Sequence, residues 1–165
     1  MCRFFHRKKL AVQTIPPVVS ETERLLRFVL SPLHFKKGKL RANIFNPTKD
    51  SDAISVTRLD YSSVEECKRL AHKMDLTKDG TPVRQYWGFG LLNKRIALEC
   101  GVKDVVSAPV EDNPAHAHIL VNEMREGDAI PASMQLVIDN LLERTKFFSD
   151  PNPNSYGWES NPLQL

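Results

Sequence analysis

The chain has 165 residues, 41% of them hydrophobic and 26% charged, with a formal net charge of +3, which is typical of a soluble globular protein of one domain and excludes disorder of the whole chain. No apolar run approaches the 18 residues of a membrane-spanning helix, and the opening residues lack the unbroken apolar stretch of a signal peptide. Three widely separated cysteines without CxxC spacing argue against a disulfide framework or a thiolate metal site, so we expect a cytoplasmic protein with no membrane association.

Positive charge is concentrated in the first third of the chain. Residues 1–50 carry 11 lysines and arginines against 3 acidic residues, whereas residues 51–165 carry 12 against 17. A basic half of this kind is either a solvated surface or a surface for an anionic partner such as nucleic acid. Two clusters supply the excess, one at the N-terminus and one in HFKKGKLR, where Gly38 predicts a hairpin-like turn: Arg3, Arg7, Lys8, Lys9 and Lys36, Lys37, Lys39, Arg41.

Strand patterns occupy most of the first two thirds of the chain. Pro16 and Pro17 end the basic N-terminal arm, because consecutive prolines continue neither a helix nor a central strand. Ser20 and Glu23 have capping-box spacing, but the following LLRFVL suits a strand, so we expect a turn and then a strand over residues 24–30. β-Branched and aromatic content predicts further strands over residues 40–45, 53–59, 85–92, 103–107 and 117–121.

Helical patterns are fewer. Ser63 and Glu66 form a capping box, and apolar residues then recur at three-four spacing as far as Met74. A longer helix is predicted from Pro131 to about residue 146, and a short one over residues 93–100.

Together these elements predict an α+β fold. We expect a single domain over residues 18–148, with a mixed or mostly antiparallel sheet of about six strands and two to three helices. A basic arm, residues 1–17, precedes this domain, and an irregular arm rich in proline and asparagine, residues 149–165, follows it.

Two histidines stand two residues apart in the segment HAHILV. On a strand, His116 and His118 would point to the same face. A zinc site needs more ligands, which His34, Glu111 or Asp112 would have to supply through the tertiary structure, and we predict no metal site. We expect at least one imidazole to be oriented by a backbone carbonyl or a carboxylate, which leaves acid–base chemistry open.

The strand predicted over residues 53–59 carries polar groups on both faces. Ser55 and Thr57 share one face, while Arg58 lies on the other with apolar residues. We interpret Arg58 either as an edge residue or as a buried fork for phosphate or carboxylate. It is a candidate binding residue, together with Lys36, Lys37, Lys39 and Arg41.

The segment QYWGFGLL is the aromatic strand of the sequence. Alternation places Trp87 and Phe89 on one face, which favours burial of both rings. The alternative is a stacking platform for bases that would act together with the basic half. Cys67, on the apolar side of a helix, and Cys100, at a helix end, are expected to be buried.

Three segments, HFKKGKLRANIFNP, ISVTRLDYSSVEECKRLA and APVEDNPAHAHI, resemble a family of small uncharacterised bacterial proteins over residues 25–121. The resemblance implies a bacterial cytoplasmic protein. The order of an arginine-bearing strand, a strand with Ser-x-Thr and a helix is also similar to the ADP-ribosyltransferase arrangement. There, an arginine or histidine on the first strand and a serine or threonine on a later one flank an NAD cleft, and a glutamate commonly completes the site.

Carried over to this chain, Arg27 matches the first position of that arrangement, and Ser55 and Thr57 match the second. No glutamate matches the third position, so the resemblance implies that His116 or His118 takes its place.

Three function hypotheses follow. The first is an interaction subunit of a larger bacterial assembly, for instance in a defence or toxin system, that docks on a protein partner. The second is an ADP-ribosyltransferase-like, nucleotide-using enzyme with Arg27, Ser55, His116 and His118 as candidate catalytic residues. The third is a nucleic-acid-binding module that uses the basic half; the sequence assigns no cofactor. Convergence of these four residues and Arg58 on one pocket would favour the enzyme, and scattered positions would favour the subunit.

Overall fold

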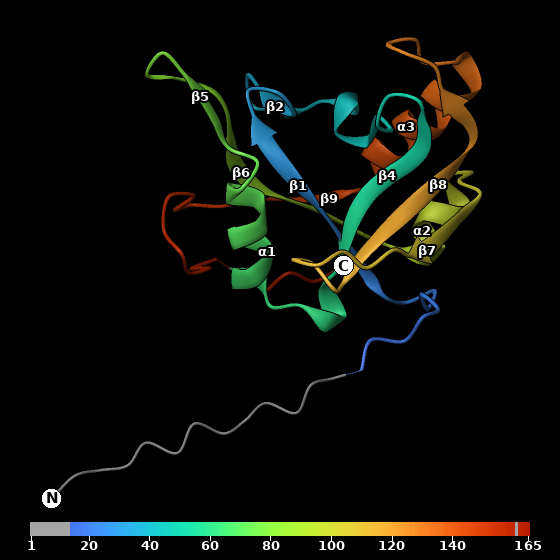
Figure 1. Ribbon diagram of the computed structural model, residues 1–165, viewed down its shortest axis with the longest axis horizontal. Helices are drawn as coiled ribbons and strands as arrows, with labels where there is room; N and C mark the ends of the chain where they lie inside the picture. Colours follow the sequence, from blue (N-terminus) through green and yellow to red (C-terminus); the bar gives the residue numbers. More distant parts are fainter. Residues whose placement is uncertain (1–13, 161) are drawn as a thin grey trace, which may run out of the picture.

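A mostly antiparallel seven-stranded sheet is the main element of the computed structural model, which describes residues 14–160 and 162–165 (Figure 1). Residues 1–13, which hold the basic cluster of the predicted N-terminal arm, and Cys2 lie outside the described residues. The strands of the sheet are β1 (Arg24–Ser31), β4 (Ser51–Arg58), β5 (Leu76–Lys78), β6 (Thr81–Asn93), β7 (Asp104–Ser107), β8 (His116–Arg125) and β9 (Lys146–Ser149). Their order is β5-β6-β1-β4-β8-β7, and β9 also pairs with β6. The predicted α+β class is confirmed.

The helices form where their caps predict them. In α1 (Val64–His72), the Ser63 side chain accepts a hydrogen bond from the Glu66 N–H, and the Glu66 side chain accepts one from the Ser63 N–H. Asn93 caps α2 (Lys94–Glu99) through the Ile96 N–H. The third helix, α3 (Ala132–Arg144), follows Pro131 as expected.

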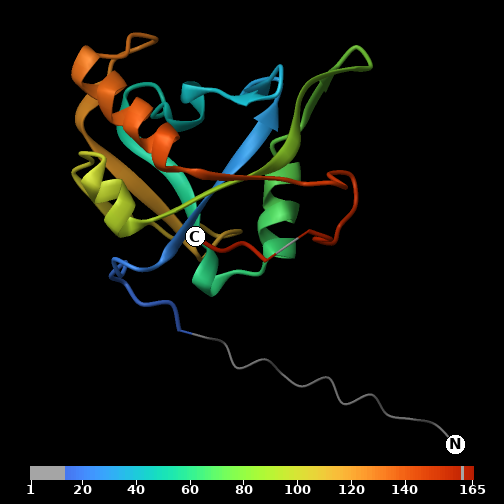
Figure 2. The same ribbon diagram turned by 180° about the vertical axis from the view of Figure 1, so that it is seen from behind.

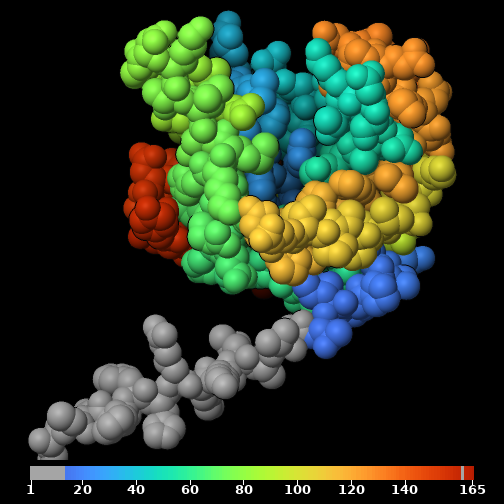
Figure 3. Space-filling view, in the orientation of Figure 1, coloured from blue at the N-terminus to red at the C-terminus, as the bar shows by residue number. Residues whose placement is uncertain are grey.

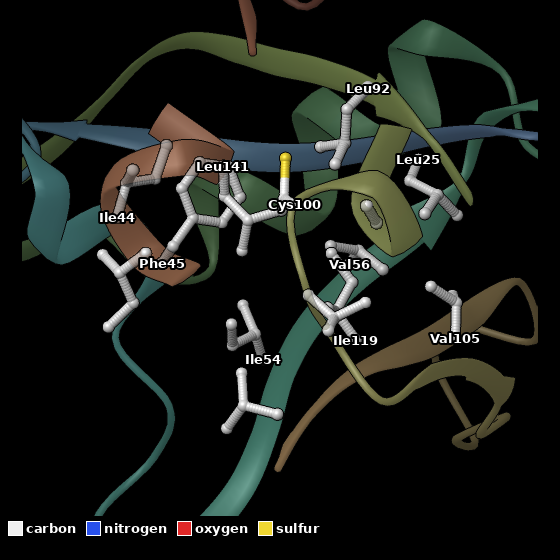
Figure 4. Packing of buried hydrophobic residues seen from close by; sticks show 14 of the residues in the cluster. Leu25, Ile44, Phe45, Ile54, Val56, Leu92, Cys100, Val105, Ile119 and Leu141 are labelled. Atoms are coloured by element: carbon white, nitrogen blue, oxygen red, sulfur yellow. The ribbon is translucent and has the colours of Figure 1, made fainter. Parts of the chain in front are cut away.

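The sheet separates two apolar cores, and Figure 2 shows α2 and α3, which cover one of them, apart from α1, which covers the other. Alternate residues of β1 point to opposite faces, so Leu25 belongs to the core under α2 and α3, while Leu26 belongs to the core under α1. Figure 4 shows the first of these cores, which includes Cys100. Cys67 lies in the second, and the predicted burial of both thiols is confirmed.

The strand predicted over residues 40–45 is wrong. This segment instead forms a 3₁₀ helix, η1 (Ala42–Phe45), after the short hairpin of β2 (Phe35–Lys36) and β3 (Lys39–Leu40). Ile44 and Phe45 are neighbours in the sequence and both fully buried, whereas a strand would place them on opposite faces. The predicted turn at Gly38 is confirmed, because Lys37 and Gly38 both have positive φ between β2 and β3.

The prediction that Trp87 and Phe89 share a buried face is also wrong. The register between β1 and β6 shifts by one residue, so that Val29 pairs with Gly88 and Leu30 with Tyr86. This bulge inverts the alternation, because one residue of β6 has no partner on β1. Phe89 packs against Tyr86 with ring centres 5.2 Å apart, while Trp87 is 36% exposed.

The described residues after Ser149, 150–160 and 162–165, form no helix or strand, and the first of them pack on α1. The buried Lys68 ammonium contacts Asp150, Ser155 and the carbonyl groups of Asn152 and Gly157. The predicted domain boundaries stay predictions. Among the described residues, none of the helices has the length and apolar character that crossing a membrane requires.

Candidate functional site

A cavity of about 380 Å³ opens where β1 and β4 separate. The two strands pair only at Leu25–Arg58 and Leu26–Thr57, whereas β1 pairs with β6 over its whole length. Figure 3 shows the hollow between α1, β4 and the loop that joins β7 to β8. Its volume falls within the range of pockets for small molecules.

The floor of the cavity is the polar face of β4 and β8. Across the two strands, Thr57 pairs with His116 and Ser55 pairs with His118, so all four side chains lie on one face of the sheet. The shared face of the histidines is thereby confirmed. Because α1 covers the same face only over β1 and β6, Ser55, Thr57 and His116 are left facing the hollow rather than a core.

Arg27 lies at the opening between the strands. Its Nε donates to the Ile44 carbonyl at 2.8 Å, and one terminal nitrogen donates to the Ser55 carbonyl at 2.7 Å. These bonds use two of its five N–H groups, and none of the described carboxylates pairs with it. Burial lowers the pKa of Arg27 from 12.5 to about 10. Arg27 is therefore a desolvated cation that lines a cavity without a counter-ion among the described residues.

The imidazole of His116 is held in one orientation. Its Nδ1 lies 2.7 Å from the Ala108 carbonyl oxygen, which only accepts, so Nδ1 carries a proton. In the neutral ring, Nε2 is then the proton acceptor. The expected orientation by a backbone carbonyl is confirmed, and it leaves a basic nitrogen on a residue that lines the cavity.

His118 lies beside this site rather than in it. Its ring centre is 4.8 Å from that of His116, with the planes nearly perpendicular, but it is not among the residues that line the cavity. Burial and the neighbouring His116 lower its pKa, and Asp52 opposes them. At neutral pH, His118 is therefore an uncharged neighbour.

Two contacts at the rim join the walls. Lys73, the C-cap residue of α1, and Asp112 of the β7–β8 loop form an ion pair of 2.7 Å, which lowers the pKa of Asp112. Asn113 donates to the Thr57 hydroxyl at 2.9 Å. From the sequence, Asp112 was considered only as a possible metal ligand, and neither Asn113 nor Lys73 was singled out. The tertiary structure brings all three to the cavity.

Of the two interpretations of Arg58, the structure shows the buried fork for a carboxylate, and that carboxylate belongs to the protein itself. β4 is an inner strand, so Arg58 is not an edge residue, and its side chain is fully buried. Glu23 accepts two hydrogen bonds from it, at 2.7 and 3.0 Å. Pro16, Val18 and Ser107 accept the rest, so all five N–H groups are used inside the fold and none is left for a ligand.

The basic hairpin lies apart from the cavity. Lys36, Lys37, Lys39 and Arg41 are exposed, and none of them is among the residues that line the pocket. Across residues 14–160 and 162–165, no group of three or more His, Cys, Asp or Glu side chains could hold a metal ion. His34 is buried and accepts from the Leu30 N–H.

Comparison with known proteins adds no homologue: no family model matches the chain, and neither a curated protein nor a solved structure was found to match it.

Proposed function

We propose that the protein binds a small anionic molecule of the nucleotide class in the cavity between β1 and β4 and acts on it as an enzyme. The observation that carries the proposal is that Arg27, Ser55 and His116, which come from three different strands, line one cavity. Three of the five residues whose convergence would favour an enzyme thus line one cavity, whereas Arg58 and His118 do not, and we give the three more weight because their polar groups face a common space. Docking on a protein partner, in a bacterial or any other assembly, stays a prediction.

Charge supports an anionic ligand. A partly buried cation without a counter-ion among the described residues is costly, and an anion that enters the cavity would compensate Arg27. Guanidinium groups bind phosphates and carboxylates through paired N–H groups, and Arg27 has three N–H groups beyond those that hold backbone carbonyls. The Ser55 and Thr57 hydroxyls can hydrogen-bond neutral parts of the same ligand.

The proposed chemistry uses His116 as the general base. In an ADP-ribosyltransferase-like reaction on NAD, the N-glycosidic bond between ribose and nicotinamide breaks. Water or an acceptor nucleophile then bonds to the ribose carbon, and Nε2 of His116 takes the proton of that nucleophile. The acidic residue at the cavity, Asp112, is engaged by Lys73 at the rim, which is why His116 is assigned the role.

The test is a binding panel followed by a reaction assay. Titration calorimetry would compare NAD, ADP-ribose, AMP and inorganic phosphate with uncharged adenosine and nicotinamide. We expect the anions to bind and Arg27→Gln to weaken them by about tenfold or more, because a hydrogen bond to a charged group contributes about 1.5–3 kcal/mol. His116→Gln should retain binding but lose the release of nicotinamide from NAD, followed by NMR.

A matched control is His72→Gln, which changes a histidine of α1 that pairs with Asp75 and does not line the cavity. It should behave as wild type in both assays. The proposal is wrong if no member of the panel binds saturably, or if Arg27→Gln folds normally and binds the anions as wild type does.

A further inference from the structure

The bulge in β6 creates a surface of stacked aromatic rings outside the cavity. Trp87 of β6 stacks on Phe35 of β2, with ring centres 6.1 Å apart and planes inclined by 22°. Phe35 stacks in turn on Phe147 of β9, at 5.1 Å and 29°. Trp87 is 36% exposed, so the stack ends in a flat ring that solvent can reach. None of these three residues lines the cavity described above.

The hairpin that carries Phe35 also carries three lysines. Lys36, Lys37 and Lys39 lie on the same hairpin as Phe35, and all three are exposed. Among the described residues, none of them pairs with a carboxylate. Elsewhere in the structure, by contrast, Lys49, Lys73 and Lys94 each form an ion pair with an aspartate.

The buried His34 adjoins the hairpin, because its carbonyl accepts a hydrogen bond from the Arg41 N–H. Its pKa is lowered from 6.5 to about 4 by burial and by Arg27, Arg84 and Arg41, and no carboxylate raises it. The charged groups named here as acting on His34 are thus all cations. In both ribbon views the β2–β3 and β5–β6 hairpins project from the same end (Figures 1 and 2).

We propose that this surface binds single-stranded nucleic acid, with a base stacked on Trp87 and the backbone phosphates on the lysines of the β2–β3 hairpin. Proteins that bind single strands combine aromatic rings, on which unpaired bases stack, with a groove or patch of positive charge. A duplex hides the faces of its bases, so the exposed ring favours the single strand. The proposal stands independently of the cavity and its ligand.

The test measures fluorescence anisotropy of labelled dT12 and rU12 over a range of salt concentrations. Single strands lose affinity with a log–log slope of about −0.7 per phosphate contact, so three lysines predict a slope of about −2. Replacing all three lysines with glutamine should remove that slope, while replacing them with arginine should preserve it. Trp87→Leu should weaken binding by about fivefold or more, because base stacking on an aromatic side chain is worth about 1–3 kcal/mol.

Tyr156→Leu is the matched aromatic control, because Tyr156 is 84% exposed in the C-terminal segment, away from the stack. It should bind the oligonucleotides as wild type does. Absence of binding at 50 mM salt would overturn the proposal. Equal affinity for a 12-bp duplex, or unchanged affinity in a folded Trp87→Leu protein, would also overturn it, because either result would reduce the surface to a non-specific basic patch.

Discussion

Two arginines of the same sheet show how partners decide the role of a residue. All five N–H groups of Arg58 donate hydrogen bonds to Glu23 and to other acceptors within the fold. These bonds hold residues 16–23 against the sheet. Arg27 uses two N–H groups, which both donate to backbone carbonyls. Its charge has no counter-ion among the described residues, and it lies beside a cavity. The first arrangement is typical of structural ion pairs, and the second is what an anion-binding site requires.

At the same scale, the lowered pKa of His34 leads us to predict how the free energy of unfolding depends on pH. Its folded pKa is about 4, below the 6.5 of the unfolded chain, so the unfolded state binds more protons between these values. The stability is therefore complete above about pH 6.5 and falls as the pH is lowered through this window, by up to about 3 kcal/mol. In His34→Asn, whose side-chain oxygen can accept from the Leu30 N–H, this fall should be absent.

Urea unfolding of the wild type and of His34→Asn at pH 7, 6 and 5 measures this difference. The comparison removes the contribution of the carboxylates, which titrate in both proteins. Parallel pH profiles for the two proteins would contradict the assignment.

At the scale of elements, two features of β6 lie side by side. The bulge against β1 turns Trp87 away from the core under α1, and the next residue, Gly88, lies opposite Ser149, where β9 pairs with β6. A Cβ at Gly88 would collide with the Phe148 carbonyl oxygen and press on Ser149 Cα. The glycine therefore allows the close approach of β9, which closes this part of the sheet.

Gly88→Ala should accordingly destabilise the protein by at least about 1–3 kcal/mol, the usual cost of overpacking, because the obstacle is backbone that cannot rotate away. Hydrogen exchange should show faster exchange in β9 than in β4. Gly157→Ala is the matched control, since no atom lies within 4 Å of its added Cβ, and its effect should stay within about 0.5 kcal/mol. Equal stability of the two variants would refute the close-approach argument.

At the scale of the whole molecule, one buried ion pair ties the C-terminal segment to α1. Lys68 Nζ lies 2.7 Å from Asp150, whose carboxylate also accepts from the Tyr86 hydroxyl. Burial and Asp150 raise the pKa of Tyr86, so its hydroxyl remains a donor. Beyond this pair, Leu163 is buried in the core under α1. The segment thus contributes to a core that α1 alone would leave open.

Lys68→Met should cost about 3–5 kcal/mol in urea unfolding, because it leaves Asp150 buried and uncompensated. Limited proteolysis should then cut within residues 150–165 before it cuts elsewhere in the described chain. Lys73→Met removes one partner of the exposed pair with Asp112 and should cost no more than about 1 kcal/mol. Adding Asp150→Asn to Lys68→Met should recover part of the loss; no recovery would argue against an uncompensated charge as the cause.

Local signals in the sequence determined most of the elements. The Ser63–Glu66 box, the turn at Gly38 and the alternation that places His116 beside His118 each depend on residues a few positions apart, so they survive in the folded protein unchanged. The same alternation put Ser55 and Thr57 on one face and thereby predicted part of the candidate site.

Only the tertiary structure decided which other parts of the protein, or which cavity, each face contacts. The partner of Arg58 is 35 positions away in the chain, and the cavity exists because β1 and β4 pair at two positions and then separate. The outward turn of Trp87 follows from a register shift against β1, and the segment 42–45 became a 3₁₀ helix because two adjacent residues were both needed in a core. Each outcome depends on contacts between distant segments, whose free energy exceeds the weak preferences of local sequence.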